Sequence, residues 1–275
     1  MSAAAPTTSA ATVTTARVGV IGSGAIGSAV IRALTAGALD GVALVGVVDN
    51  RPVVDCPVPQ MSVAEAVGSC DVIVECAGQV VVAQYAAEIL DAGVDLLVTS
   101  VGALADPAVA DRVRAAGPGR MLCTAGAVGG IDLLAAAASA APLRRIAVTT
   151  TKRPAALVQP WMDRAAEERL RTATAPVEVF RGTAREAATA FPRSLNVAAT
   201  VALATGGFDA VEVVLVADPD TELTTHVIEA EGATGEYRFE IRNHPSQANP
   251  RTSGVVPFAV LRSLAVLVGR PIRIV

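Results

Sequence analysis

A glycine-rich turn near the start of the chain constrains the fold more than any other feature. Gly22, Gly24 and Gly27 follow the short apolar run Arg17–Ile21, and a helix-forming stretch continues to Ala36. Apolar runs of this length next to glycine are typical of buried parallel strands. A strand, a glycine turn and a helix in this order bring free backbone N–H groups and the positive end of a helix dipole together. That arrangement suits a bound phosphate.

The residues after the turn point to a dinucleotide as the phosphate-bearing ligand. A second apolar run, Val42–Val48, ends at Asp49, 22 residues after Gly27. An acidic residue at this place in a βαβ unit binds the ribose hydroxyls of a dinucleotide. Asp49 favours NAD because its charge repels a 2'-phosphate, although Asn50 and Arg51 could donate to that phosphate. The sequence therefore predicts that NAD is preferred and that NADP is tolerated.

Strands and helices continue to alternate up to about residue 125. The predicted strands are Asp71–Cys76, Asp95–Thr99 and Arg120–Thr124, and the predicted helices are 62–67, 80–92 and one that begins near Asp106. This alternation predicts an α/β fold with a doubly wound parallel sheet, a Rossmann domain. The cofactor contacts predicted in this part are Gly22, Gly24, Ala25, Ile26, Gly27, Asp49, Asn50, Ala77, Gly78 and Ser100.

The pattern changes after Gly130 to that of an α+β segment. Helices are predicted at 132–141, 163–172, 184–190 and 196–204, and strands at 145–151, 211–217, 224–230 and 235–242. Residues 224–230 alternate in character, which predicts an antiparallel sheet with two different faces. An apolar helix at 255–268 is expected to return to the first domain. The predicted organisation is a flexible tail at 1–16, a dinucleotide-binding domain at 17–125 and 246–275, and a substrate domain at 126–245.

Composition excludes several classes of protein. Hydrophobic residues make up 52% of the chain and charged residues 17%, which is typical of a globular protein and not of a disordered one. A net charge of -4 without a basic run argues against binding of nucleic acid. No apolar run is long enough to span a membrane, and the first 16 residues do not resemble a secretory signal. We expect a cytoplasmic protein.

Few residues are suited to acid–base or metal chemistry. Four cysteines are spaced neither as a zinc site nor as a redox pair, so no metal is predicted and buried thiols are the simpler interpretation. The two histidines are His226, on a predicted strand, and His244, in a turn. Lys152 is the single lysine among 22 basic residues. Either a bias toward arginine or a site that needs a compact ammonium group explains it, and we take Lys152 as a candidate substrate contact.

Several strings, read together in this order, resemble the L-aspartate dehydrogenase family. They are 20–27 (VIGSGAIG), 100–106 (SVGALAD), 125–132 (AGAVGGID), 151–154 (TKRP), 180–187 (FRGTAREA), 196–200 (NVAAT), 217–219 (ADP) and 249–253 (NPRTS). The glycine string is generic, whereas its combination with the others is specific. Ala155 and Arg251 depart from the usual family residues, which bears on details of the substrate pocket.

The resemblance implies an activity and site residues. It implies a nicotinamide-dependent homodimer that interconverts L-aspartate with oxaloacetate and ammonia through iminosuccinate. His226 matches the active-site histidine, and Ala127 and Asn196 match cofactor contacts; Asn196 also borders the substrate. A base that titrates near the working pH suits the proton transfers, and His226 is the candidate. Lys152, Arg181 and Arg185 are candidates for binding the carboxylates of this dicarboxylic substrate, and surface salt bridges are an equally good interpretation of the two arginines.

Two other functions fit the same sequence. One is a related two-domain dehydrogenase or imine reductase that acts on another amino or keto acid, because a fold alone does not determine the substrate. The other is a non-catalytic NAD(H)-binding protein that has kept the Rossmann domain. The strings around His226 and Asn196 argue against the second alternative.

Overall fold

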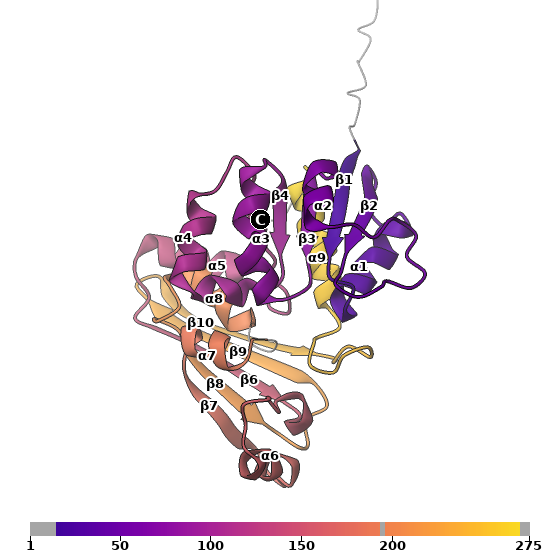
Figure 1. Ribbon diagram of the computed structural model, residues 1–275. Coiled ribbons are helices and arrows are strands. Elements are labelled where there is room, and N and C mark those ends of the chain that lie inside the picture. The colour runs from indigo at the N-terminus through magenta and orange to yellow at the C-terminus, as the bar shows by residue number, and fades with distance from the viewer. Residues whose placement is uncertain (1–14, 193–195, 270–275) are drawn as a thin grey trace, which may run out of the picture.

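The two halves of the chain each build a five-stranded sheet (Figure 1). The computed structural model describes residues 15–192 and 196–269. Most of the tail predicted at 1–16, and the last residues of the segment 246–275, lie outside the described residues. Among the described helices, none is long and apolar enough to cross a membrane.

The first sheet is entirely parallel and confirms the predicted Rossmann-like fold class. Its strands are β1 (Ala16–Ile21), β2 (Val42–Val48), β3 (Val72–Glu75), β4 (Asp95–Val98) and β5 (Met121–Cys123). Their order in the sheet is β2-β1-β3-β4-β5. The chain thus leaves β1 toward one side and later returns on its other side. At such a switch point, a crevice opens beyond the carboxyl ends of the strands and receives the ligand.

Helices complete this half. They are α1 (Ala25–Thr35), α2 (Val63–Ser69), α3 (Gln79–Asp91), the 3-10 helix η1 (Val101–Ala105), α4 (Pro107–Ala115) and, from the end of the chain, α9 (Val256–Leu267). A capping box between Ser62 and Glu65 begins α2, as the sequence indicates. Helix α9 packs against α1 and β4, so the two ends of the described chain meet on one sheet (Figure 1).

The second sheet is mixed, which corrects the antiparallel sheet expected from the sequence. Its strands are β6 (Arg145–Lys152), β7 (Val177–Thr183), β8 (Glu212–Ala217), β9 (Thr224–Gly232) and β10 (Gly235–Asn243), in the order β10-β9-β6-β8-β7. β6 and β8 are parallel, and the other neighbours are antiparallel. The accompanying helices are α5 (Ile131–Ala140), η2 (Pro154–Ala156), α6 (Arg164–Arg171), α7 (Ala184–Ala190) and α8 (Asn196–Thr205).

Strand β7 is absent from the sequence-based prediction. It lies at the edge of the sheet, and most of its residues are half-buried or exposed. A strand with a weakly buried face lacks the regular alternation of apolar and polar residues that identifies strands in a sequence. The alternation predicted in β9, by contrast, is present: His226, Ile228 and Ala230 are buried, and Thr225, Val227 and Glu229 between them are half-buried. The side chain of His226 therefore points to the covered face.

We predict that Gly27→Ala destabilises the protein. A Cβ atom at Gly27 would lie 1.8 Å from the carbonyl oxygen of Gly22, so the turn would have to shift. We expect a loss of about 1–3 kcal/mol in unfolding free energy, measured by urea denaturation, together with weaker NADH binding. Gly68 is the matched control, because a Cβ there meets nothing within 4 Å and the residue is helical. Equal effects of G27A and Gly68→Ala would contradict this packing argument.

Candidate active site

The glycine turn leaves the start of α1 open to a ligand. Gly22 has a φ of 95°, and a Cβ there would lie 2.7 Å from the backbone of Ala77. Gly24 is the N-cap of α1 and makes no side-chain capping bond, and a Cβ at this position would meet nothing within 4 Å. Helix α1 also has no acidic residue in its first turn. Its free N–H groups and positive dipole end are thus available to a pyrophosphate.

Asp49 lies at the end of β2 and is held against this turn. Its carboxylate accepts hydrogen bonds from the Ser23 backbone N–H at 2.8 Å, from the Ser23 hydroxyl at 2.6 Å and from the Arg51 N–H at 3.0 Å. Burial acts to raise the pKa of Asp49, but these bonds outweigh it, and the pKa is lowered. The group is therefore an anion at neutral pH. Asn50 follows it in an exposed turn.

Glu75 is a functional candidate that the sequence reasoning missed. It ends β3, is 1% exposed, and accepts backbone N–H bonds from two turns. Ala77 and Gly78 donate at 2.8 and 2.7 Å, and Thr99 and Ser100 at 3.2 and 3.0 Å; the Ser100 hydroxyl donates at 2.9 Å. Burial raises the pKa of the Glu75 carboxyl, and these hydrogen bonds oppose the rise. Within an apolar strand, Glu75 gave no sequence signal beyond its position.

The Glu75 carboxylate determines which helix start can receive a ligand anion. Gly78 is the N-cap of α3, and Ser100 is the N-cap of η1. Both helices begin at the carboxyl edge of the parallel sheet, where the positive ends of their dipoles would attract an anion. Glu75 already occupies both positions with its own negative charge. Of these three helix starts at the switch point, α1 is the one whose N-cap N–H meets no side-chain anion within the described residues, because Asp49 binds Ser23, one residue before the N-cap Gly24.

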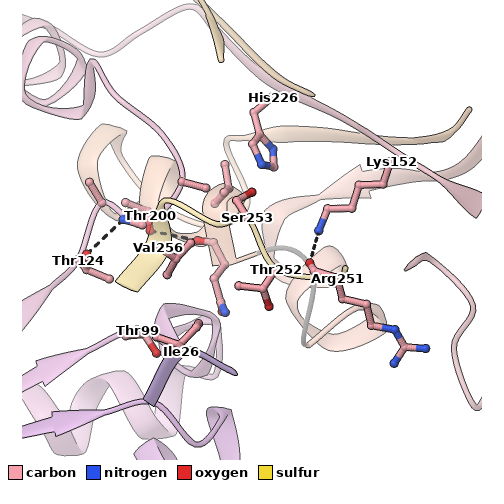
Figure 2. Close-up of a pocket in the computed structure, with 15 residues that line it drawn as sticks. Ile26, Thr99, Thr124, Lys152, Thr200, His226, Arg251, Thr252, Ser253 and Val256 are labelled. Carbon is pink, nitrogen blue, oxygen red and sulfur yellow. Dashed lines mark hydrogen bonds between the residues drawn. The ribbon is translucent and has the colours of Figure 1, made fainter. Parts of the chain in front are cut away.

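A cleft lies between the two sheets (Figure 2). Its lining includes five residues predicted from the sequence, namely Ile26, Ala127, Lys152, Asn196 and His226. It also includes residues that the prediction did not single out, namely Thr99, Thr124, Ala125, Gly126, Val197, Thr200, Arg251, Thr252, Ser253 and Val256. Ile26 and Thr99 approach from the first sheet, and His226 and Lys152 from the second (Figure 2). The cleft thus joins the glycine turn to the second domain.

His226 is 2% exposed and meets Thr150 on the neighbouring strand. The Thr150 hydroxyl lies 2.9 Å from Nδ1 of the imidazole. Burial and the positive charge of Lys152 lower the pKa of His226 to about 3. The expectation of a histidine that titrates near neutrality is therefore wrong for the free protein. Burial, together with the nearby Lys152 charge, overrides the ordinary pKa of the imidazole, and His226 is neutral at physiological pH.

Lys152 lies two residues beyond Thr150 on the same face of β6 and is 4% exposed. Its ammonium donates to the backbone carbonyl of Arg251 at 2.9 Å (Figure 2). Burial, with a contribution from the Arg251 charge, lowers the pKa of Lys152 to about 8. The segment from Arg251 to Ser253 closes this side of the cleft. In the sequence, this segment belongs to the family string at 249–253, and that resemblance does not show where the segment lies in the fold.

Asn196 and Ala127 connect the two halves beside the cleft. Asn196 begins α8, and its side-chain oxygen accepts the Gly102 backbone N–H at 3.1 Å. The carbonyl of Ala127 accepts from the Asn243 side chain at 2.8 Å. These bonds hold elements of the second half against the η1 region and the 125–130 loop. Both residues therefore occupy a place where a ligand would touch both halves.

Arg181 and Arg185 do not reach the cleft, which corrects their candidacy as carboxylate ligands. Arg181 is exposed on β7 and pairs with Glu178 and Glu212. Arg185, on α7, makes a two-pronged pair with Asp209 at 2.7 Å. Both guanidinium groups are thus neutralised on other surfaces, away from His226.

The described part of the molecule contains no disulfide and no candidate metal site. Cys56, Cys70, Cys76 and Cys123 are all free thiols. Burial raises the pKa of Cys76 and Cys123, which makes their thiolates unfavourable. Over residues 15–192 and 196–269, no three His, Cys, Asp or Glu side chains are grouped so that they could hold a metal ion.

Comparisons with known proteins agree with this geometry. Residues 132–267 match the family described as aspartate dehydrogenase, C-terminal, and residues 22–118 match the NAD-binding domain of homoserine dehydrogenase. The L-aspartate dehydrogenase of Ralstonia pickettii (strain 12J) is 41% identical over 199 residues, which cover 70% of this chain and 73% of the relative. That of Ruegeria pomeroyi is 42% identical over 200 residues, 70% of each chain. The chain therefore belongs to the L-aspartate dehydrogenase family.

Solved structures support the assignment over nearly the whole chain. The crystal structure of aspartate dehydrogenase from Thermotoga maritima has a TM-score of 0.74 and 26% sequence identity, and the match covers 94% of this chain and 99% of that one. Scyllo-inositol dehydrogenase from Lactobacillus casei, with a TM-score of 0.54 at 13% identity, shares the fold. The resemblance seen in the sequence is thus confirmed. The protein is an NAD(P)-dependent amino-acid dehydrogenase.

We predict that Glu75→Gln lowers both stability and cofactor affinity. An amide in place of the carboxylate turns an NH2 group toward backbone N–H donors, which leaves buried donors without an acceptor. We expect a loss of about 1–3 kcal/mol in urea unfolding and weaker NADH binding by fluorescence titration. Glu65→Gln is the control, because glutamine serves the capping box equally well. Unchanged NADH affinity in E75Q would refute a role for Glu75 in shaping the site.

Proposed function

We propose that this protein interconverts L-aspartate with oxaloacetate and ammonia through iminosuccinate, using NAD(H). One observation carries the proposal: neutral His226 and cationic Lys152 enter one cleft that also borders the glycine turn. Its relatives of about 40% identity are L-aspartate dehydrogenases. An amino-acid substrate with two carboxylates fits a cleft with a buried ammonium and several hydroxyl groups.

The residues at the first sheet fit a nicotinamide dinucleotide. Gly22, Gly24 and the α1 start would hold the pyrophosphate, and Asp49 the adenosine ribose. Ala77, Gly78 and Ser100 form the floor that Glu75 fixes, and Ile26, Ala127 and Asn196 border the end of the cleft near His226. The bound cofactor supplies or accepts the hydride at the substrate Cα. Anionic Asp49 supports a preference for NAD, and Arg51 beside it supports tolerance of NADP.

Lys152 is the proposed ligand of a substrate carboxylate. Its ammonium is fixed by the Arg251 carbonyl, so little side-chain freedom is lost when a carboxylate binds. Charge-assisted hydrogen bonds of this kind are stronger than neutral ones. Thr200, Thr252 and Ser253 line the same cleft and offer hydroxyl groups to the rest of the substrate. Together they would fix the orientation of the substrate above the glycine turn.

His226 is proposed as the catalytic residue that exchanges a proton with the reacting substrate. The free protein keeps it neutral, which is the form that a general base requires. Arrival of a dicarboxylate adds negative charge beside Lys152 and His226, and this favours the protonated imidazole. The pKa of His226 is therefore expected to rise when the substrate binds. The homodimer and the cytoplasmic location stay predictions.

The proposal predicts that NADH oxidation requires oxaloacetate and ammonium together. Absorbance at the NADH band would be followed with both co-substrates and with each omitted in turn, and then repeated with NADPH. We expect turnover only when both are present, with a higher kcat/KM for NADH. Pyruvate and 2-oxoglutarate plus ammonium serve as comparison substrates. Faster turnover with either of them would show that the enzyme acts on another amino acid than aspartate.

His226→Ala provides the matching variant for the same assay. We expect NADH binding to persist and turnover to fall about 10²–10⁴-fold, the usual contribution of a general acid–base group. His244→Ala is the control at the second histidine, which lies outside the cleft lining. Full turnover in H226A would remove His226 from the mechanism while leaving the substrate assignment intact.

The lowered pKa of Lys152 predicts that the binding of a dicarboxylate depends on pH. Its pKa of about 8 means that the ammonium loses its proton as the pH rises through 8, and the attraction for a carboxylate is then lost. We expect the inhibition constant of succinate, an unreactive dicarboxylate, to rise above pH 8. Lys152→Arg should abolish this rise because arginine stays charged. Lys152→Met should weaken inhibition about 10–100-fold below pH 8 and should remove the rise above pH 8, because no ammonium is left to titrate.

The exposed neighbour Arg153 supplies the control for Lys152. It binds the Thr221 carbonyl on the surface, so Arg153→Met should leave the inhibition constant of succinate almost unchanged. A pH profile of K152M that matches the wild-type profile would exclude Lys152 as the titrating group.

A further inference from the structure

The contact between Thr150 and His226 is built into the second sheet. The two residues are direct partners in the antiparallel pairing of β6 and β9. Thr150 is fully buried, and its hydroxyl oxygen lies 2.9 Å from Nδ1 of His226. The other ring nitrogen, Nε2, belongs to the side chain that enters the cleft (Figure 2). The hydroxyl thus contacts the ring on the side away from the substrate.

The hydrogen-bond balance of this pair decides where the imidazole proton lies. A neutral imidazole has one N–H and one acceptor nitrogen, and a hydroxyl has one proton to donate. Within the described part of the chain, the Thr150 hydroxyl has His226 as its hydrogen-bond partner and no other. If it accepted from Nδ1–H, its own proton would be buried without an acceptor, which is unfavourable. If it donates to Nδ1, the hydroxyl proton is satisfied.

The charges around His226 favour the same arrangement. A histidine that stores positive charge is commonly supported by a carboxylate on Nδ1–H. Here the partner on Nδ1 is a neutral hydroxyl, and the charged group on the same face of β6 is the cation Lys152. Neither of these groups draws the proton to Nδ1.

We infer that Thr150 is a positioning residue that donates its hydroxyl proton to Nδ1 of His226 and holds the tautomer with the proton on Nε2. The free enzyme then presents an N–H donor to the cleft. A neutral imidazole of this kind can polarise a substrate carbonyl. The catalytic consequence of this inference rests on the proposed function. The Nε2–H of the free enzyme can donate to the carbonyl oxygen of a keto acid. The ammonium group of an amino acid is itself a donor, so it would offer Nε2–H no acceptor. General-base action at Nε2 requires the other tautomer, in which the ring proton has left Nε2 and lies on Nδ1, with the Thr150 hydroxyl turned to accept it.

The tautomer can be observed directly by NMR without any turnover. The chain has two histidines, so labelling with 15N-histidine and recording long-range proton–nitrogen correlations gives two ring systems, and His244→Gln assigns them. We expect Nε2 of His226 to be the protonated nitrogen at neutral pH in the ligand-free enzyme. A spectrum with the proton on Nδ1 would overturn the inference, whatever the substrate of the enzyme proves to be.

Three variants separate positioning from simple packing. Thr150→Val keeps the shape and removes the hydroxyl, Thr150→Ser keeps the hydroxyl, and Thr149→Val changes the neighbouring threonine on the opposite face of β6. We expect T150V to mix the two tautomers and to lower kcat for oxaloacetate amination about 10-fold, with KM changed less than about 3-fold. T150S should retain the Nε2–H signal and most of kcat, and T149V should match the wild type.

The outcomes distinguish this inference from the proposed function. An unchanged tautomer and an unchanged kcat in T150V would overturn the role of Thr150 while His226 and the substrate assignment stand. If T150V fails to fold, T150S and the wild-type spectrum still decide the tautomer. If no keto acid supports turnover, the proposed function fails, and the nitrogen spectrum alone confirms or refutes the hydrogen-bond assignment.

Discussion

The carboxylate of Glu75 is the interaction on which the rest of the site depends. It gathers four backbone N–H groups and one hydroxyl from the turns after β3 and β4. Because these turns begin α3 and η1, one side chain both fixes the floor of the crevice and occupies two helix dipoles. A buried anion is tolerated where so many donors meet it. The start of α1 then remains as the proposed place for a ligand's phosphates.

In the second sheet the buried ionisable groups are basic, and burial favours their neutral forms. Both His226 and Lys152 are buried away from water, and burial lowers the pKa of each. The result is a neutral imidazole beside a cation that is close to losing its proton. A substrate with two negative charges compensates the buried ammonium and favours its charged form. Charge complementarity at Lys152 therefore favours a substrate that carries a carboxylate over a neutral sugar, which agrees with the proposed dicarboxylate.

The sequence predicted features that are local or periodic. The glycine turn, Asp49 after β2 and the alternation in β9 each follow from neighbouring residues. The first two predict the proposed dinucleotide site, and the third correctly predicts the buried face of His226. Glu75, the β6–β8 parallel pair and the 251–253 segment depend on contacts between distant parts of the chain. A carboxylate inside an apolar run does not reveal in the sequence which N–H groups it will meet. For the same reason Arg181 and Arg185 looked suitable until their acidic partners were known.

The rarity of lysine becomes understandable from this cleft. Arginine accounts for all the other basic residues, and it stays charged under any conditions that a protein meets. A buried guanidinium beside His226 would carry its full desolvation cost whenever the substrate is absent. An ammonium with a pKa of about 8 keeps its charge at neutral pH and can release its proton at higher pH, and a bound carboxylate favours its charged form. Lys152 thus combines deep burial with a charge that can still be released, which no arginine offers.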